Sequence, residues 1–334
     1  MKRLWLFYLL PLPVIFASLF VGPTDSVSAG AIWQSLFTPA QVSPDESPAP
    51  SALAEAVLWN VRLPRILLAF LVGAALTVSG TALQALTRNP LVSPDIVGLS
   101  SGAAFGAALA LALGWLPLQV SAFLFGLLAA LLSVFLAASR RGLSVLNLVL
   151  GGIIVGALFT SLLTLVQIST DPFKLQSIVH WTMGNLHNAS WSKLSSAWLP
   201  ILGGSLLLFW LRWRLNAIAL GDEEMQAVGL NPAREKLFIL LPSVLLASSS
   251  VAVAGIIGMV SLAVPHLIRM MVGANNRHTV PVSLTFGGSF LVLVDTLARS
   301  ITTFEVPVGI FTTLVGGPFF IYLLKRHGAA FGDE

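Results

Sequence analysis

Long apolar runs separated by short polar interruptions dominate the chain. The first apolar run covers Leu4–Val21, and further runs cover about 62–86, 98–113, 116–138, 143–168, 193–211, 237–256, 257–272, 279–301 and 306–324. A transmembrane helix needs about 20 predominantly apolar residues, so most of these runs are long enough to cross a bilayer. The pattern predicts an all-α, polytopic transmembrane helical bundle of about ten spans.

Composition supports the same class of protein. Of the 334 residues, 56% are hydrophobic and only 10% are charged, whereas a soluble globular domain typically has about 25% charged residues. A soluble globular protein is therefore excluded, and we expect one transmembrane domain over residues 1–334 in contact with membrane lipid. The chain has no cysteine, which excludes disulfides, thiolate metal sites and a cysteine nucleophile.

The basic residues indicate topology. The formal net charge is +4, but Lys and Arg are scattered at the ends of the apolar runs, so no nucleic-acid partner is expected. With the N-terminus inside, most of the 18 basic residues fall on the cytoplasmic side, as the positive-inside rule requires. The cytoplasmic residues are Lys2, Arg3, Arg88, Arg140, Arg141, Arg212, Arg214, Arg234, Lys236, Arg269, Arg277, Lys325 and Arg326. The external ones are Arg62, Arg65, Lys174, Lys193 and Arg299. We predict a multi-pass protein of the bacterial inner membrane with both termini cytoplasmic.

The N-terminal apolar run has two interpretations. It could be a cleaved signal peptide, because Val27-Ser28-Ala29 resembles a cleavage site. The run is longer than a usual signal core, however, which favours a retained first helix. The following segment, 22–51, is rich in Pro and Ser, and we expect it to be an external loop.

The most highly charged island between apolar runs is the segment 212–236. It is predicted to form two short helices with a break, because Asp222 can cap the first, Gly229 suits a left-handed residue, and Asn231-Pro232 is a typical helix start. Acidic residues in the first turn are favoured by the helix dipole. The segment could be a solvated loop, but well-capped helices favour a surface that docks a cytoplasmic partner.

The spans offer little chemistry to drive transport or catalysis. Asp295 is the main charge within an apolar run and is expected to pair with Arg299 at i, i+4. No Lys is followed by Ser or Thr and no His by Glu, so the sequence has neither a phosphate-binding P-loop nor the common zinc-protease motif. We expect no catalytic residue, metal site or cofactor. A secondary transporter or channel that works alone is the alternative class.

Several motifs occur in order along nearly the whole chain after the first helix. They are Arg62-Leu63-Pro64-Arg65, Gly73-Ala74-Ala75, Ser79-Gly80, Gln84-Ala85, Arg88 to Gly98 (RNPLVSPDIVG), Ser101 to Ala104 (SGAA), Leu220-Gly221, Ala227 to Leu230 (AVGL), Gly255 to Gly258 (GIIG), Val264 to Arg269 (VPHLIR), Asp295 to Arg299 (DTLAR), Glu305 to Gly309 (EVPVG), Gly316 and Pro318. Together they closely resemble the FecCD (vitamin B12 transporter-like) family of ABC importer permeases.

This resemblance implies a type II ABC importer permease with ten helices. Two permease subunits, as a homodimer or heterodimer, would sit on two cytoplasmic ABC ATPase subunits and receive cargo from an extracytoplasmic substrate-binding protein. The ATPase-coupling residues implied are Leu220, Gly221, Asp222, Glu223, Glu224, Ala227, Gly229 and Leu230. The arginines implied to dock the binding protein are Arg62, Arg65 and Arg299. Their alternative roles are interfacial snorkelling or local ion pairs.

The transport path is also implied by resemblance. The fifth and tenth helices and a short external helix from Asp171-Pro172 to about Leu186 would line it. The inner gate would include Asn89, Leu91, Ser144 and Val145, and the path Thr160, Ser161, Thr164 and Gln167. Small hydroxyl residues are equally common as packing groups. The cargo expected is a metal chelate, in the first place a ferric siderophore, with cobalamin or haem as alternatives.

Overall fold

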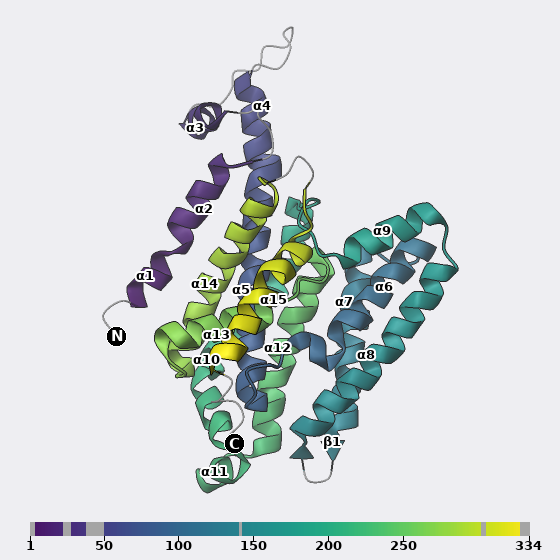
Figure 1. The fold of residues 1–334 in the computed structure, drawn as a ribbon, viewed down its shortest axis with the longest axis vertical. Coiled ribbons are helices and arrows are strands. Elements are labelled where there is room, and N and C mark those ends of the chain that lie inside the picture. The colour runs from purple at the N-terminus through teal and green to yellow at the C-terminus, as the bar shows by residue number, and fades with distance from the viewer. Residues whose placement is uncertain (1–3, 23–27, 38–49, 140–141, 302–304, 328–334) are drawn as a thin grey trace.

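The computed structural model describes residues 4–22, 28–37, 50–139, 142–301 and 305–327 as an elongated bundle of helices (Figure 1). In this part of the chain, six helices are long and apolar enough to cross a membrane, and four shorter apolar helices accompany them. The ten apolar helices match the ten predicted runs, most within a few residues at each end. The fold class is therefore confirmed as an all-α polytopic bundle.

Helix α5 is the centre of the bundle. Residues 52–87 form one continuous helical run, and 83% of its most apolar window is buried, against 22% for α8 at the edge. Pro64 lacks a backbone N–H, and a π-helical turn that ends at Arg62 lies just before it. The run comprises α4 (Pro50–Val57), η1 (Leu58–Arg62) and α5 (Leu63–Thr87).

Four helices surround α5, and glycines set two of the contacts. A Cβ at Gly73 would meet the backbone oxygen of Gly287, and one at Gly80 would meet that of Ser261. Small residues allow such close helix approach within membranes. The surrounding helices are α10 (Trp191–Leu220), α12 (Pro232–Ala254), α13 (Val260–Val272) and α14 (Asn276–Ala298).

A second group of helices forms one edge of the molecule (Figure 1). A two-residue antiparallel hairpin joins two of its helices and is a small departure from the predicted all-helical chain. Gly102 and Gly106 allow α6 to lie against the backbone of α7. The group comprises η2 (Pro94–Val97), α6 (Leu99–Leu113), α7 (Leu118–Ala137), β1 (Ala138–Ser139), β2 (Gly142–Leu143), α8 (Val145–Ile168) and α9 (Pro172–Thr182).

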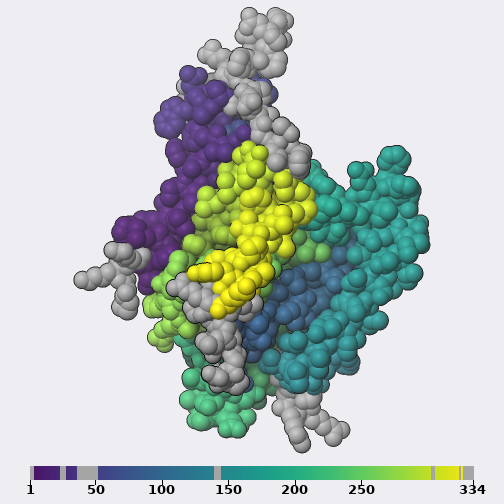
Figure 2. Space-filling view, in the orientation of Figure 1, coloured from purple at the N-terminus to yellow at the C-terminus, as the bar shows by residue number. Residues whose placement is uncertain are grey.

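The N-terminal and C-terminal helices cover the central group. The first predicted span is divided at Leu10 and packs against α14, where Phe7 contacts the ring of Phe286. Figure 2 shows the last helix lying across the front of the bundle. The segment predicted as an external loop contains a helix of its own, α3. These elements are α1 (Leu4–Leu9), α2 (Pro11–Phe20), α3 (Ala29–Phe37) and α15 (Val308–His327).

The charged island differs from its prediction in extent. Helix α10 continues nine residues past its predicted end, because Arg212 and Arg214 lie against aromatic rings and Arg214 pairs with Glu235 of α12. The island therefore holds one separate short helix, α11 (Asp222–Ala227), and the second predicted short helix is the start of α12. Gly221, not Asp222, occupies the N-cap position of α11.

Candidate functional site

Helix α11 projects from one end of the bundle (Figure 1). Gly221 precedes it with φ +139°, a conformation that side chains rarely adopt. The Lys236 Nζ donates to the Asp222 Oδ2 at 2.7 Å, which ties α11 to the first turn of α12. Arg214 Nη1 reaches both oxygens of Glu235 at 2.7 and 2.9 Å, which ties α10 to α12. A short helix is thereby fixed to two long ones.

The outward face of α11 is free to meet a partner. Met225 is fully buried and anchors the helix, while Leu220 and Val228 are 67% and 68% exposed. Gly229 ends the segment with φ +80°, and no atom lies near the position of a Cβ there, so the requirement for glycine is conformational. The exposed residues Glu223, Glu224, Gln226 and Ala227 complete this face. Of the predicted coupling residues, Leu220, Glu223, Glu224, Ala227 and Gly229 are exposed, while Gly221 is buried; a coupling role stays a prediction.

The predicted inner-gate residues follow the end of α5 and open α8, and these two helix ends lie towards the same end of the bundle as α11 (Figure 1). Arg88 ends α5 in the left-handed region with φ 54°, and the next residue, Asn89, accepts a hydrogen bond from the Leu91 N–H at 2.9 Å. Ser144 caps α8, accepting from the Asn147 N–H at 3.3 Å, and Val145 is the first residue of that helix. A tight turn and a capped helix start thus hold these residues; a gating role stays a prediction.

The predicted path residues of α8 face different surroundings. The Thr160 hydroxyl donates to Ser101 of α6 at 3.3 Å, so it contributes to packing between helices. The hydroxyls of Ser161 and Thr164 donate to carbonyls of their own helix, and both side chains are exposed. Gln167 is half-buried. Thr160, Ser161 and Thr164 are therefore all exposed, and a path role stays a prediction.

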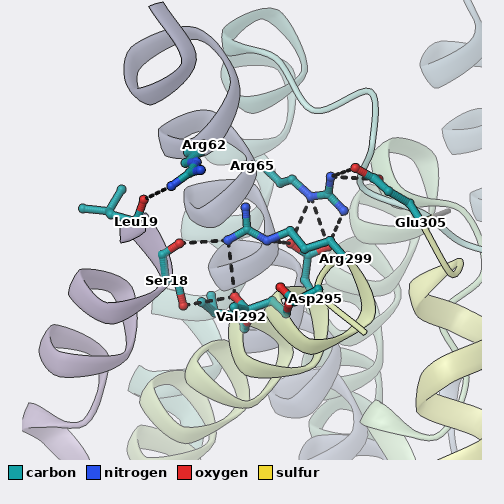
Figure 3. Close-up of polar contacts among 10 residues, drawn as sticks. Ser18, Leu19, Arg62, Arg65, Val292, Asp295, Arg299 and Glu305 are labelled. Atoms are coloured by element: carbon teal, nitrogen blue, oxygen red, sulfur yellow. Dashed lines mark hydrogen bonds and ion pairs between the residues drawn. The ribbon is translucent and has the colours of Figure 1, made fainter. Parts of the chain in front are cut away.

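At the opposite end, three arginines converge on α14 and α2 (Figure 3). Arg65 makes a two-pronged contact with Asp295, at 3.0 Å from Nε to Oδ2 and 2.9 Å from Nη2 to Oδ1. Its Nη1 also donates to both oxygens of Glu305, at 3.0 and 2.9 Å. Arg299 lies 3.9 Å from Asp295 at the nearest N–O approach. The expected i, i+4 partner is thus secondary, and the main partner of Asp295 is Arg65.

Two of these arginines also hold the first helix (Figure 3). Arg62 Nη1 donates to the Leu19 carbonyl at 2.6 Å, and Arg299 Nη2 donates to the Ser18 carbonyl at 2.8 Å. These carbonyls lie in the last turn of α2, where they lack helical partners. Arg62, Arg65 and Arg299 are only 3%, 6% and 2% exposed. All three have internal acceptors, so the structure gives them a role in stability, and binding-protein docking stays a prediction.

The predicted short external helix is present as α9. Asp171 caps it, accepting from the N–H groups of Phe173 and Lys174 at 3.1 Å each. It ends at Thr182, earlier than predicted, because Gly184 takes φ +68°. His180, His187 and Lys193 lie around the end of this helix and were not predicted as site residues. Their only signal in the sequence is that histidines lie near a predicted external helix.

The fold is that of a polytopic membrane protein. The profile of the FecCD transport family matches residues 9–326, and the chain belongs to this family. It is 43% identical over 279 residues to the molybdate import system permease protein MolB of Haemophilus influenzae, covering 81% of this chain and 82% of that one.

Two further similarities agree with this membership. The chain is 38% identical over 270 residues to an iron chelatin transport system permease protein of Helicobacter pylori, covering 81% of this chain and 82% of that one. A solved inward-facing structure of a metal-chelate type ABC transporter matches with a TM-score of 0.83 and 37% identity, over 97% of this chain and 99% of that chain. The chain is therefore an ABC importer permease, a transport subunit of the membrane.

Proposed function

We propose that this permease moves a metal chelate, in the first place a ferric siderophore, inward across the bacterial inner membrane. Energy would come from ATP hydrolysed by separate cytoplasmic subunits. The observation that carries the proposal is the exposed, rigidly held surface of α11 in a chain of this family. A solvated loop would need neither the ion pair between Lys236 and Asp222 nor that between Arg214 and Glu235.

The same contacts suggest how ATPase closure would act on the path. A push on α11 passes directly into α10 and α12, because ion pairs join all three. Helices α10 and α12 both pack against α5, whose cytoplasmic end carries the turn at Asn89. Movement at α11 would therefore reach the proposed inner gate through packed helices rather than through flexible loops. Two ATPase subunits and a second permease subunit, identical or related, complete the proposed assembly.

The external partner would be a substrate-binding protein that docks near the arginine cluster. Glu305 is the most accessible charged group of that cluster, with a side chain 36% exposed, while the arginines are buried. Docking through these arginines would therefore require them to exchange an internal acceptor for a carboxylate of the partner. The test is binding of the partner to the full chain in nanodiscs at increasing ionic strength, where an affinity that does not change with salt removes this assignment.

The nature of the cargo follows from the relatives only in broad terms. Ferric siderophore is our first candidate, and the similarity to an iron chelatin permease supports it. Molybdate is the second, because the relative named for molybdate import is 43% identical to this chain. Cobalamin and haem are further alternatives on the same scaffold.

The experiment that tests the proposal is uptake of labelled cargo by cells with and without this chain under iron limitation. Loss of ferric siderophore uptake alone is the expected result. Loss of molybdate, cobalamin or haem uptake would keep the importer and replace the cargo. An ATP-independent transporter or channel instead predicts transport by the chain alone in liposomes without nucleotide, and that result would overturn the proposed mechanism.

A further inference from the structure

A cavity of about 470 Å³ with both polar and apolar walls lies beside α9, a helix far from α11 in the bundle (Figure 1). The ends of α9, α10 and α12 and the loop between α9 and α10 surround it, and Trp181, Val253 and Ala254 supply part of its apolar wall. Its volume is within the range of small-molecule sites. We call it the outer pocket and define it by its polar lining residues Gln176, Ser177, His180, Asn185, His187, Asn188 and Lys193.

The loop that carries His187 is held in place by its backbone. The Asn185 N–H donates to the Ala254 carbonyl at 2.8 Å, and the Gly184 carbonyl accepts from the Gly309 N–H at 3.0 Å. The Asn185 side chain donates to the His180 carbonyl at 3.0 Å. The loop is therefore fixed to α9, α12 and α15 at once. A site built on fixed elements can hold ligand groups at defined positions.

The charges of the outer pocket are of one sign. No carboxylate lines it, and within the described residues the Lys193 ammonium has no ion pair or hydrogen bond. The rings of His180 and His187 meet edge to face at 4.7 Å between centroids. Lys193 is half-buried, so its charge is partly removed from water without compensation from the protein. This arrangement favours an anionic ligand.

A metal cation fits the outer pocket less well. The described residues contain no group of three or more acidic, histidine or cysteine side chains able to hold one. Glu305 lies in an adjoining cavity of about 450 Å³, together with Arg65, His180 and His187, but Arg65 already binds both of its oxygens. The polar groups around the outer pocket are an ammonium, imidazoles and side-chain amides, which are groups that bind oxyanions and carboxylates.

We propose that the outer pocket is an entry site for anionic cargo, which Lys193 and His187 bind through the oxygen atoms of a metal oxyanion or of an anionic metal chelate. This inference rests on the proposed function, since it names the charge class of the cargo that this permease carries. A half-buried ammonium and neutral amides give attraction without enclosing the ligand, as a transient site on a transport path requires. The position beside α9 agrees with the expected course of the path.

Binding should depend on pH through His187. Burial lowers the pKa of His187 below its usual value, and the nearby charges of His180, Lys193 and Arg65 lower it further against the opposing effect of Glu305. The lowered pKa favours the neutral imidazole, so His187 gains its proton at a lower pH than an ordinary histidine. A protonated ring adds a second positive donor, so anion affinity should rise with acidification.

The test measures binding by equilibrium dialysis to the full chain in nanodiscs, without ATPase or binding protein. The probes are radiolabelled molybdate, ferric citrate and, as an uncharged comparison, cyanocobalamin. We expect Lys193→Gln and His187→Gln to weaken binding of an anionic probe by roughly tenfold. Lys193→Arg should retain it. Lys174→Gln is the control, because Lys174 lies on α9, later residues of which line the outer pocket, but does not line the pocket itself.

Each outcome bears on the inference. Binding of molybdate alone would identify the cargo as a metal oxyanion, and binding of ferric citrate alone would identify it as an anionic chelate. In either case the binding must depend on Lys193. Absence of anion binding to the wild-type chain, or equal affinity in all variants, overturns the inference even if ATP-driven uptake in cells is intact. The chain could instead bind the anion through Lys193 and still fail every uptake assay. That result would support the outer pocket as an anion site and contradict the proposed function.

Discussion

Arg65 and Asp295 lie 230 positions apart in the sequence and form a two-pronged ion pair in the structure, with N–O distances of 3.0 and 2.9 Å. Both residues are buried, at 6% and 1% exposure. The pair joins α5, the central helix, to α14 directly beside the carbonyls that close the first helix. Its geometry is of the strong, directional type that arginine forms with carboxylates.

Replacing Asp295 by Asn should destabilise the protein. The buried guanidinium of Arg65 would keep only Glu305, and that of Arg299 would lose its nearest carboxylate, at a cost of about 3–5 kcal/mol. We expect the melting temperature in detergent, followed by tryptophan fluorescence, to fall by roughly 5 °C or more. The control is Asp171→Asn, whose ion pair with Lys174 is half-exposed at 3.9 Å. Equal melting temperatures for the two variants would contradict this role of Asp295.

Replacing Gly229 by Val should abolish coupling without removing the protein from the membrane. A β-branched residue does not tolerate φ +80°, so the end of α11 would change its course. We expect loss of cargo uptake and of cargo-stimulated ATP hydrolysis at unchanged protein level. Gly203→Val is the matched control, because a Cβ there meets no atom and the backbone is ordinary helix. Normal uptake by the Gly229 variant would remove the proposed contact with an ATPase.

Replacing Gly80 by Ala should separate α5 from α13. The new methyl group would collide with the backbone of Ser261, which cannot move aside as a flexible side chain can. We expect a loss of about 1–3 kcal/mol in the free energy of unfolding. Gly317→Ala places its methyl group in open space and should be neutral or slightly stabilising. Chemical unfolding of both purified variants measures the difference, and identical midpoints would contradict the contact.

Removing residues 2–21 should prevent stable assembly of the bundle. The buried side chains of Arg62 and Arg299 would lose the carbonyls of Leu19 and Ser18, each loss costing about 1–3 kcal/mol. The measurement is the yield of folded protein in membranes, together with the mass of the mature chain. Ser18→Ala keeps both carbonyls and should assemble normally. A mature N-terminus at Gly30 would show instead that the first helix is cleaved.

Much of the fold could be read from the sequence, because apolar length in a membrane is a local property. Each span is fixed by whether some 20 consecutive residues can be buried in hydrocarbon, and caps such as Asn231 and Asp171 are recognised by adjacent residues. One exception is α10, whose last turns are charged. They remain helical because Arg214 finds Glu235 on a neighbouring helix, and no local pattern reports that contact.

The sequence by itself thus determined the bundle, its approximate spans, the family resemblance and the position of the charged segment 212–236. Only the tertiary structure decided what the polar residues at the opposite end do. It placed Arg65 between Asp295 and Glu305, turned the arginines inward to the first helix, and gathered His180, His187 and Lys193 around one cavity. The physical reason is that hydrophobic burial acts on each segment separately, whereas an ion pair or a pocket depends on which helix ends meet in space.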